Sequence, residues 1–139
     1  MNPAISVRNI VDKKRIIDVL ENHPSVLFAY LYGSAIKEKK FNDIDIAVFL
    51  KPDLHPFLIS ADLKILLSEK TGINPDLFDI RVINDLVTHG DILSLLYLKH
   101  VFETGILIID KDDHLRTSFI EKYGMKYREC ESLISEVLT

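Results

Sequence analysis

A glycine-serine turn between two apolar runs is the feature that most constrains the fold of this chain. The first run, residues 26–32, is rich in aromatic and β-branched residues and ends at Gly33-Ser34. It predicts a short strand that stops in a sharp turn. Glycine lets a ligand approach the main chain closely, and the serine hydroxyl adds a hydrogen-bond donor. A turn of this kind can hold a phosphate group.

Two aspartates open the second apolar run, residues 43–50. On a strand, Asp43 and Asp45 lie on one face, because side chains alternate between faces. Their Cα atoms would be roughly 6 to 7 Å apart, which suits two divalent cations spaced about 4 Å apart. The alternative for the pair alone is a turn at residue 43 and a solubilising Asp45 on an edge strand. The upstream Gly33-Ser34 turn favours a metal and nucleotide site.

The order Gly33-Ser34, spacer, Asp43-x-Asp45 resembles the signature of the DNA polymerase β nucleotidyltransferase superfamily. More narrowly, it resembles the minimal nucleotidyltransferases that serve as MNT antitoxins beside HEPN toxins. The resemblance covers nearly the whole chain and implies a third carboxylate on a later strand. We assign that role to Asp76, at the head of a strand predicted over residues 76–82. Asp79 is the alternative, because only one of the two can face the site from a regular strand.

The chain departs from the family pattern in two places. The spacer between Ser34 and Asp43 holds eight residues, fewer than is usual in the family, and Lys37-Glu38 stands where Arg-Gly is common. Lysine lacks the bidentate fork of arginine. Lys37, one turn beyond the Gly-Ser turn, is therefore expected to reach a triphosphate as a point charge.

Composition limits the class of protein. The 139 residues are 47% hydrophobic and include one cysteine, Cys130, which predicts a single domain over residues 1–139 without an internal disulfide, in the cytoplasm. No apolar run approaches the ~18 to 20 residues that cross a bilayer. With 17 basic and 21 acidic side chains the net charge is −4, which argues against broad nucleic-acid binding.

Hydrophobic periodicity predicts the remaining elements. Helices are expected over residues 10–21, 56–71, 92–104 and 115–137, and a last strand over residues 106–109. His23, beside a proline, is expected to be an exposed turn residue. The fold class is α/β, as an α+β two-layer nucleotidyltransferase fold: a small mixed sheet with helices packed on one face and a long C-terminal helix. The end of that helix, from Cys130 on, is a candidate surface for a partner or a second copy.

The resemblance implies a mechanism. Asp43, Asp45 and Asp76 would hold two Mg²⁺ ions, and Gly33, Ser34 and Lys37 would bind ATP. AMP would pass to a hydroxyl, most plausibly a tyrosine of a HEPN toxin, so that the chain acts as the antitoxin. The alternatives are an antitoxin that occludes its toxin without transfer, a nucleotidyltransferase acting on a small molecule, and, ranked below these, a receiver-type signalling domain.

Overall fold

Four strands form one mixed sheet in the computed structural model, which describes residues 10–33, 43–52 and 55–138. The sheet order is β3-β2-β1-β4. The strands are β1 (Val26–Tyr32), β2 (Ile44–Leu50), β3 (Phe78–Val82) and β4 (Ile106–Asp110). β1 is antiparallel to both β2 and β4, whereas β2 and β3 are parallel. The mixed sheet confirms the α+β class expected from the sequence.

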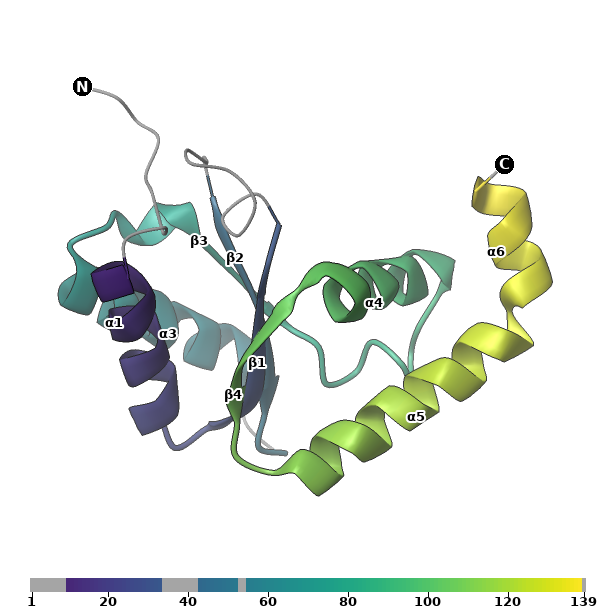
Figure 1. The fold of residues 1–139 in the computed structure, drawn as a ribbon, viewed down its shortest axis with the longest axis horizontal. Helices are drawn as coiled ribbons and strands as arrows, with labels where there is room; N and C mark the ends of the chain where they lie inside the picture. The colour runs from purple at the N-terminus through teal and green to yellow at the C-terminus, as the bar shows by residue number, and fades with distance from the viewer. Residues whose placement is uncertain (1–9, 34–42, 53–54, 139) are drawn as a thin grey trace.

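Helices cover both faces of the sheet (Figure 1). They are α1 (Ile10–Asn22), α3 (Pro56–Thr71), α4 (Ile92–Thr104), α5 (Asp113–Glu129) and α6 (Glu131–Leu138), with a 3-10 turn, η1 (Pro75–Leu77), before β3. α1 and α3 lie on one side of the sheet, and α4 and α5 lie on the other. α3 is the crossover that parallel pairing of β2 and β3 needs.

The expectation that helices pack on one face only is wrong, because β1 is apolar on both faces. Leu31 packs with Leu20 and Leu67 in an aliphatic core beneath α1 and α3. Phe28 and Tyr30 point the other way, into an aromatic core with α4 and α5. A strand buried on both faces needs cover on both sides.

The C-terminal helix was predicted as one long helix, and the structure divides it at Cys130. Residue 130 ends α5 with φ −103° and ψ 6°, and α6 turns away from the α5 axis (Figure 1). The turn brings α6 against α4, and Ile134 of α6 is 1% exposed. A straight helix of this length would have carried Ile134 beyond the cover of the small sheet. None of the described helices is both long and apolar enough to cross a bilayer.

The predicted helix ends are confirmed where a single residue type determines them. Gly72 ends α3 with φ +76°, the left-handed conformation that favours glycine. The Asp91 side chain accepts a hydrogen bond from the Ser94 backbone N–H at the start of α4. Gly105 follows the end of α4. These local signals determine where α3 ends and where α4 begins and ends.

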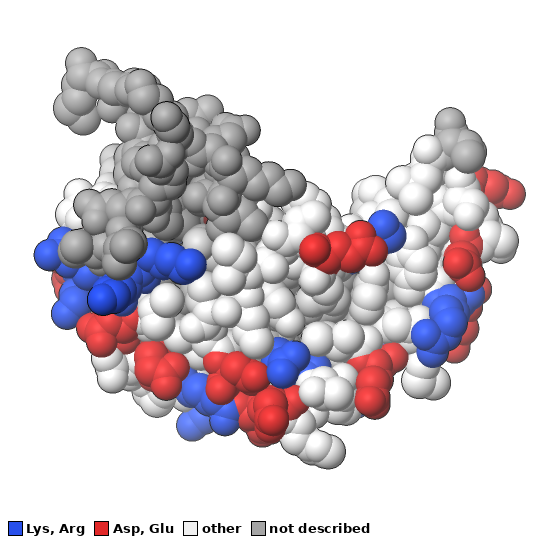
Figure 2. Space-filling model, viewed as in Figure 1, with Lys and Arg blue, Asp and Glu red and all other residues white. Residues whose placement is uncertain are grey.

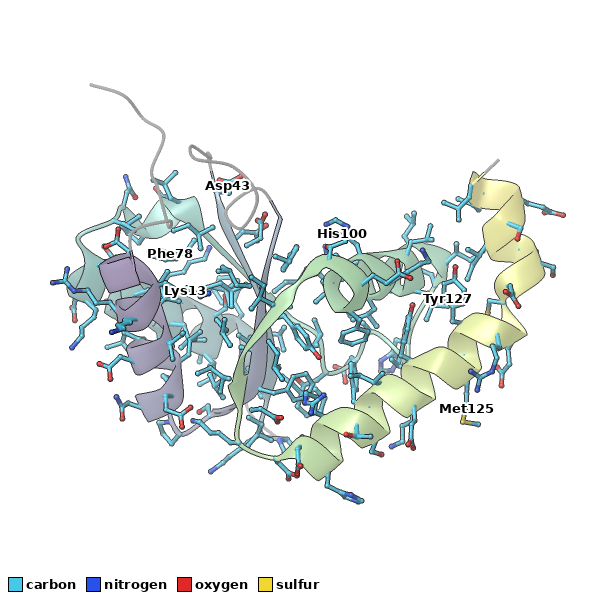
Figure 3. The ribbon with its side chains drawn as sticks, in the orientation of Figure 1. Lys13, Asp43, Phe78, His100, Met125 and Tyr127 are labelled. Carbon is cyan, nitrogen blue, oxygen red and sulfur yellow. The ribbon has the colours of Figure 1, made fainter. Side chains whose placement is uncertain are left out.

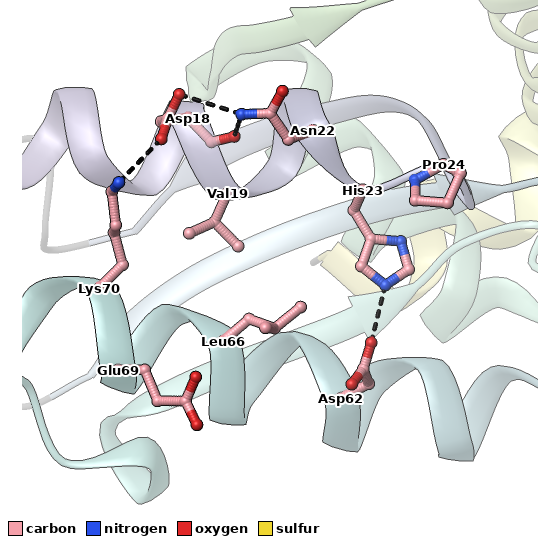
Figure 4. Close-up of a pocket in the computed structure, with 9 residues that line it drawn as sticks. All are labelled: Asp18, Val19, Asn22, His23, Pro24, Asp62, Leu66, Glu69 and Lys70. Carbon is pink, nitrogen blue, oxygen red and sulfur yellow. Dashed lines mark hydrogen bonds and ion pairs between the residues drawn. The ribbon is translucent and has the colours of Figure 1, made fainter.

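His23 is not an exposed turn residue: it is 8% exposed, at the end of α1 facing α3. Its Nδ1 accepts a hydrogen bond from the Ser25 backbone N–H, so in the neutral ring Nε2 carries the proton and donates to the Asp62 carboxylate 2.9 Å away (Figure 4). The adjoining proline did not reveal this, because the contact depends on how α3 packs against α1. The two residues join the helices that cover the aliphatic core.

Removing this side chain is expected to destabilise the fold. His23→Ala leaves the Ser25 N–H without its partner and opens a small cavity, so the free energy of unfolding should fall by about 2 kcal/mol. His55→Ala is the matched control, because His55 is exposed and makes no side-chain cap to α3. Denaturant unfolding measures both variants. Equal stability of the two variants would contradict a structural role for His23.

Candidate active site

The candidate site lies where β1 ends and where β2 and β3 begin. Gly33 follows the last residue of β1, Asp43 immediately precedes β2, and Asp45 lies within it. The register places Tyr32 opposite Asp45 on one side and Asp79 beside Asp45 on the other. Figure 3 shows Asp43 at this end of β2. The structure thus brings Gly33, Asp45 and Asp79 together at one end of the sheet.

Gly33 and Asp45 are in close contact. Gly33 has φ +80°, and a Cβ atom placed on it would overlap Oδ2 of Asp45. Only glycine combines this backbone angle with the absence of a side chain. The turn that the sequence assigned to phosphate and the carboxylate that it assigned to a cation therefore belong to one site.

Asp45 lies among other carboxylates. Burial, the nearby charges of Asp79 and Asp43, and hydrogen bonding with Asp79 together raise the pKa of its carboxyl from 3.8 to about 6, and burial is the largest of these causes. Crowded carboxylates favour either a shared proton or a bound cation. Oxygen atoms of this kind are the ligands that Mg²⁺ prefers. The donor set therefore fits a divalent cation.

The carboxylates of Asp43, Asp45 and Asp79 lie near one another but are not arranged around a single point. Within the described ranges, no group of three or more His, Cys, Asp or Glu side chains is arranged to hold one ion. Asp45 and Asp79 are paired in register on β2 and β3, and the charge of Asp79 acts on the Asp45 carboxyl. Asp43 is exposed just before β2, so its side chain has room to rotate toward that pair.

The structure corrects the predicted start of the third strand. Residues 75–77 form the 3-10 turn η1, and β3 begins only at Phe78. Pro75 starts the turn, and the Asn74 side chain accepts a hydrogen bond from the Asp76 backbone N–H at 2.9 Å. Asp76 is exposed in that turn and is not among the groups that shift the pKa of Asp45. The geometry thus favours Asp79, the alternative third carboxylate.

Two of the expected nucleotide-binding residues cannot be placed. Ser34 and Lys37 lie outside the described residues. Their roles in binding a nucleotide stay predictions.

A cluster that the sequence did not reveal lines the site beside the carboxylates. The Tyr97 hydroxyl donates a hydrogen bond to the Tyr32 hydroxyl at 2.7 Å, and the Arg81 guanidinium lies 4.2 Å from the centroid of the Tyr97 ring. Burial raises the pKa of both tyrosines. His100 of α4 lies edge-on to Tyr32, with ring centroids 6.1 Å apart, and is labelled in Figure 3. Only the position of Arg81, two residues after Asp79, was readable from the sequence.

Comparison with protein families now decides the assignment. The family described as "Polymerase beta, Nucleotidyltransferase" matches residues 14–114, which include β1, β2 and β3 with all of the carboxylates above. The chain belongs to the polymerase β nucleotidyltransferase family. No curated protein matches this nucleotidyltransferase.

Solved structures share the fold of this nucleotidyltransferase. A crystal structure of a mutant of the toxin-antitoxin pair MntA-HpeT matches with a TM-score of 0.60 and 21% identity, over 91% of this chain and 98% of the other. The MNT antitoxin in a complex with a tri-AMPylated HEPN toxin from Shewanella oneidensis matches with 0.56 and 23%, over 92% and 97%. A toxin-antitoxin structure with AMP-PNP matches with 0.60 and 22%, over 91% and 98%. At these identities the matches establish the fold.

A separate pocket of about 720 Å³ lies on the opposite face of the nucleotidyltransferase sheet, between α1 and α3 (Figure 4). Val19 and Leu66 lie at its centre, and its rim carries Asp18, which pairs with Lys70 at 3.2 Å. Tyr32 and the carboxylates belong to the other face, with α4. The pocket is therefore not part of the candidate active site.

Proposed function

We propose that this chain transfers AMP from ATP, with Mg²⁺, to a tyrosine hydroxyl of a HEPN-type toxin and so acts as its antitoxin. The observation that carries the proposal is the contact between the Gly33 turn and Asp45, which lies beside Asp79. A phosphate-binding turn and crowded carboxylates are the two parts that nucleotidyl transfer requires. Membership of the nucleotidyltransferase family supports the reaction class. The solved complex of an MNT antitoxin with an AMPylated HEPN toxin supports the choice of acceptor.

The carboxylates are proposed to hold the metal ions. Asp43, Asp45 and Asp79 take this role, with Asp79 in the place first assigned to Asp76. Mg²⁺ bound there supplies positive charge that lowers the pKa of the attacking hydroxyl and neutralises the phosphates. Protonation of the carboxylates would compete with binding of the cation, so affinity for the ion should fall at acidic pH.

The turn is proposed to hold the phosphates. Gly33 leaves the main chain open to the β- and γ-phosphates, and Ser34 and Lys37 are proposed to donate hydrogen bonds to them. The acceptor hydroxyl gives up its proton to water, its oxygen bonds to the α-phosphorus, and the bond from that phosphorus to the departing pyrophosphate breaks. Asp45 and Asp79 would position the α-phosphate through the cation that they are proposed to hold.

Intact mass spectrometry tests the proposal. The chain is incubated with a purified HEPN-type protein, ATP and Mg²⁺, and the mass of that protein is followed with time. We expect a gain of one or more AMP units that disappears when EDTA is added. A stable complex with no mass change would replace the proposal with an antitoxin that acts by occlusion.

A further inference from the structure

We infer that Arg81, held over the ring of Tyr97, binds the phosphate group that this enzyme transfers. The inference rests on the proposed function and adds a substrate-binding residue to its site. Arg81 lies two residues after Asp79 on β3, on the same face of the sheet. Its neighbour on β2 is Ala47, which is buried in the aromatic core that Tyr32 also joins.

Tyr97 and Tyr32 connect Arg81 to the carboxylates through a chain of contacts. The Arg81 guanidinium covers the Tyr97 ring at 4.2 Å, and the Tyr97 hydroxyl bonds to the Tyr32 hydroxyl at 2.7 Å. Tyr32 is buried opposite Asp45. The charges of Asp45, Asp79 and Arg81 all act on the Tyr32 hydroxyl. Arg81 and the carboxylates therefore belong to one site.

The guanidinium is both positioned and available. Arg81 is exposed, and within the described part of the chain none of the ion pairs involves it. Stacking on an aromatic ring fixes the plane of a guanidinium while its N–H groups stay directed outward. Such a planar fork matches the oxygens of a phosphate in a bidentate contact. Little side-chain entropy is then lost when the phosphate binds.

The position of Arg81 in the sheet determines which phosphate of ATP this residue binds. Gly33, on the β1 side of Asp45, is where the proposed function places the β- and γ-phosphates. Asp79 and Arg81 are on the β3 side of Asp45. The phosphate nearest to Arg81 is consequently the α-phosphate, which lies over the carboxylates. The same phosphate reaches Arg81 from two sources, ATP before transfer and the modified acceptor after it.

The test compares four variants with the wild-type enzyme. Arg81→Ala removes the cation, and Arg81→Lys keeps the charge without the fork. Tyr97→Leu removes the ring beneath the guanidinium, whereas Tyr97→Phe keeps the ring and removes only the hydrogen bond to Tyr32. For each, kcat and KM for ATP and the affinity for purified AMP-modified acceptor are measured, with thermal melting as the check on folding.

We expect kcat/KM of Arg81→Ala to fall about 10- to 100-fold, the loss of one charge-assisted contact, with an unchanged melting temperature. Arg81→Lys should recover part of the activity, and Tyr97→Phe should lose less than Tyr97→Leu. If only the affinity for the modified acceptor falls, the phosphate contact is made after transfer. If Arg81→Ala keeps the wild-type kcat/KM for ATP and the wild-type affinity for the modified acceptor, the inference is overturned while the proposed function stands. Failure of the wild-type enzyme to transfer AMP would overturn the proposed function itself.

Discussion

Asp45→Asn is expected to abolish AMP transfer and, at the same time, to raise the melting temperature of the metal-free protein. Activity should fall by about 10² to 10³-fold or more, because the variant lacks a carboxylate that would hold the cation facing the reacting phosphates. Stability should rise because Asp45 is partly buried beside Asp79 and Asp43, and asparagine has no charge to be repelled. A site residue selected for chemistry commonly lowers the stability of the fold in this way.

The stabilisation of Asp45→Asn relative to the wild-type protein should depend on pH. The pKa of Asp45 is raised to about 6 in the folded chain, from 3.8, so folding favours the protonated carboxyl. The wild-type protein therefore has this contribution to its stability below about pH 4, the pKa expected in the unfolded chain, and loses it as pH rises through about 6. Above pH 6 the free energy of unfolding of Asp45→Asn should exceed that of the wild-type protein by about 1 kcal/mol, or about 3 °C in Tm, after allowance for solvent screening.

Melting curves of wild-type and Asp45→Asn protein in EDTA, between pH 4 and pH 8, measure this effect. Asp85→Asn is the control, because Asp85 is an exposed aspartate in the loop before α4. The two curves should meet near pH 4 and separate above pH 6 for Asp45→Asn only. A destabilised Asp45→Asn at pH 8 would show that the carboxylate has a structural role that outweighs the repulsion.

Gly33→Ala is expected to inactivate the enzyme, whereas Gly72→Ala should be tolerated. Both glycines have left-handed backbone angles, φ +80° at Gly33 and +76° at Gly72, so alanine costs about 1 kcal/mol of conformational strain at either position. Only at Gly33 would the new Cβ overlap Asp45, because nothing lies within 4 Å of the corresponding atom at Gly72. The difference between the two variants isolates the close approach of the turn to the carboxylate.

The pair is compared by AMP transfer and by denaturant unfolding. Gly72→Ala should lose about 1 kcal/mol of stability and keep its activity. Gly33→Ala should lose activity beyond what its stability explains, because Asp45 has to move away from its place beside Asp79. Comparable activity in the two variants would mean that the contact between Gly33 and Asp45 is not required for transfer.

The parts of the structure that the sequence predicted well depend on local chemistry. The apolar run before Gly33 gave the bounds of β1 correctly, and Gly72 and Asp91 marked helix ends through backbone angles and capping that act within a few residues. The same local signals placed Gly33 and Asp45 next to each other, whereas their roles in a metal and nucleotide site stay predictions.

The errors arose where a residue's role depends on distant packing. His23 is buried because α3 supplies Asp62, 39 residues away. The C-terminal helix divides at Cys130 and α6 contacts α4, which helical periodicity cannot reveal. The start of β3 was also predicted too early: a cap at Asn74 delays the strand by two residues, and the side chain beside Asp45 is Asp79. Which of Asp76 and Asp79 is the third ligand stays a prediction.

The measurement that most directly tests the central claim compares Asp79→Asn with Asp76→Asn. Both variants remove one carboxylate from the same four-residue stretch, residues 76–79, but only Asp79 lies in register with Asp45. The rate of AMP incorporation into the HEPN-type acceptor is followed by intact mass spectrometry at saturating Mg²⁺ and ATP. We expect Asp76→Asn to keep near wild-type activity and Asp79→Asn to lose at least about 100-fold. The reverse result, an active Asp79→Asn and an inactive Asp76→Asn, would contradict the site described here.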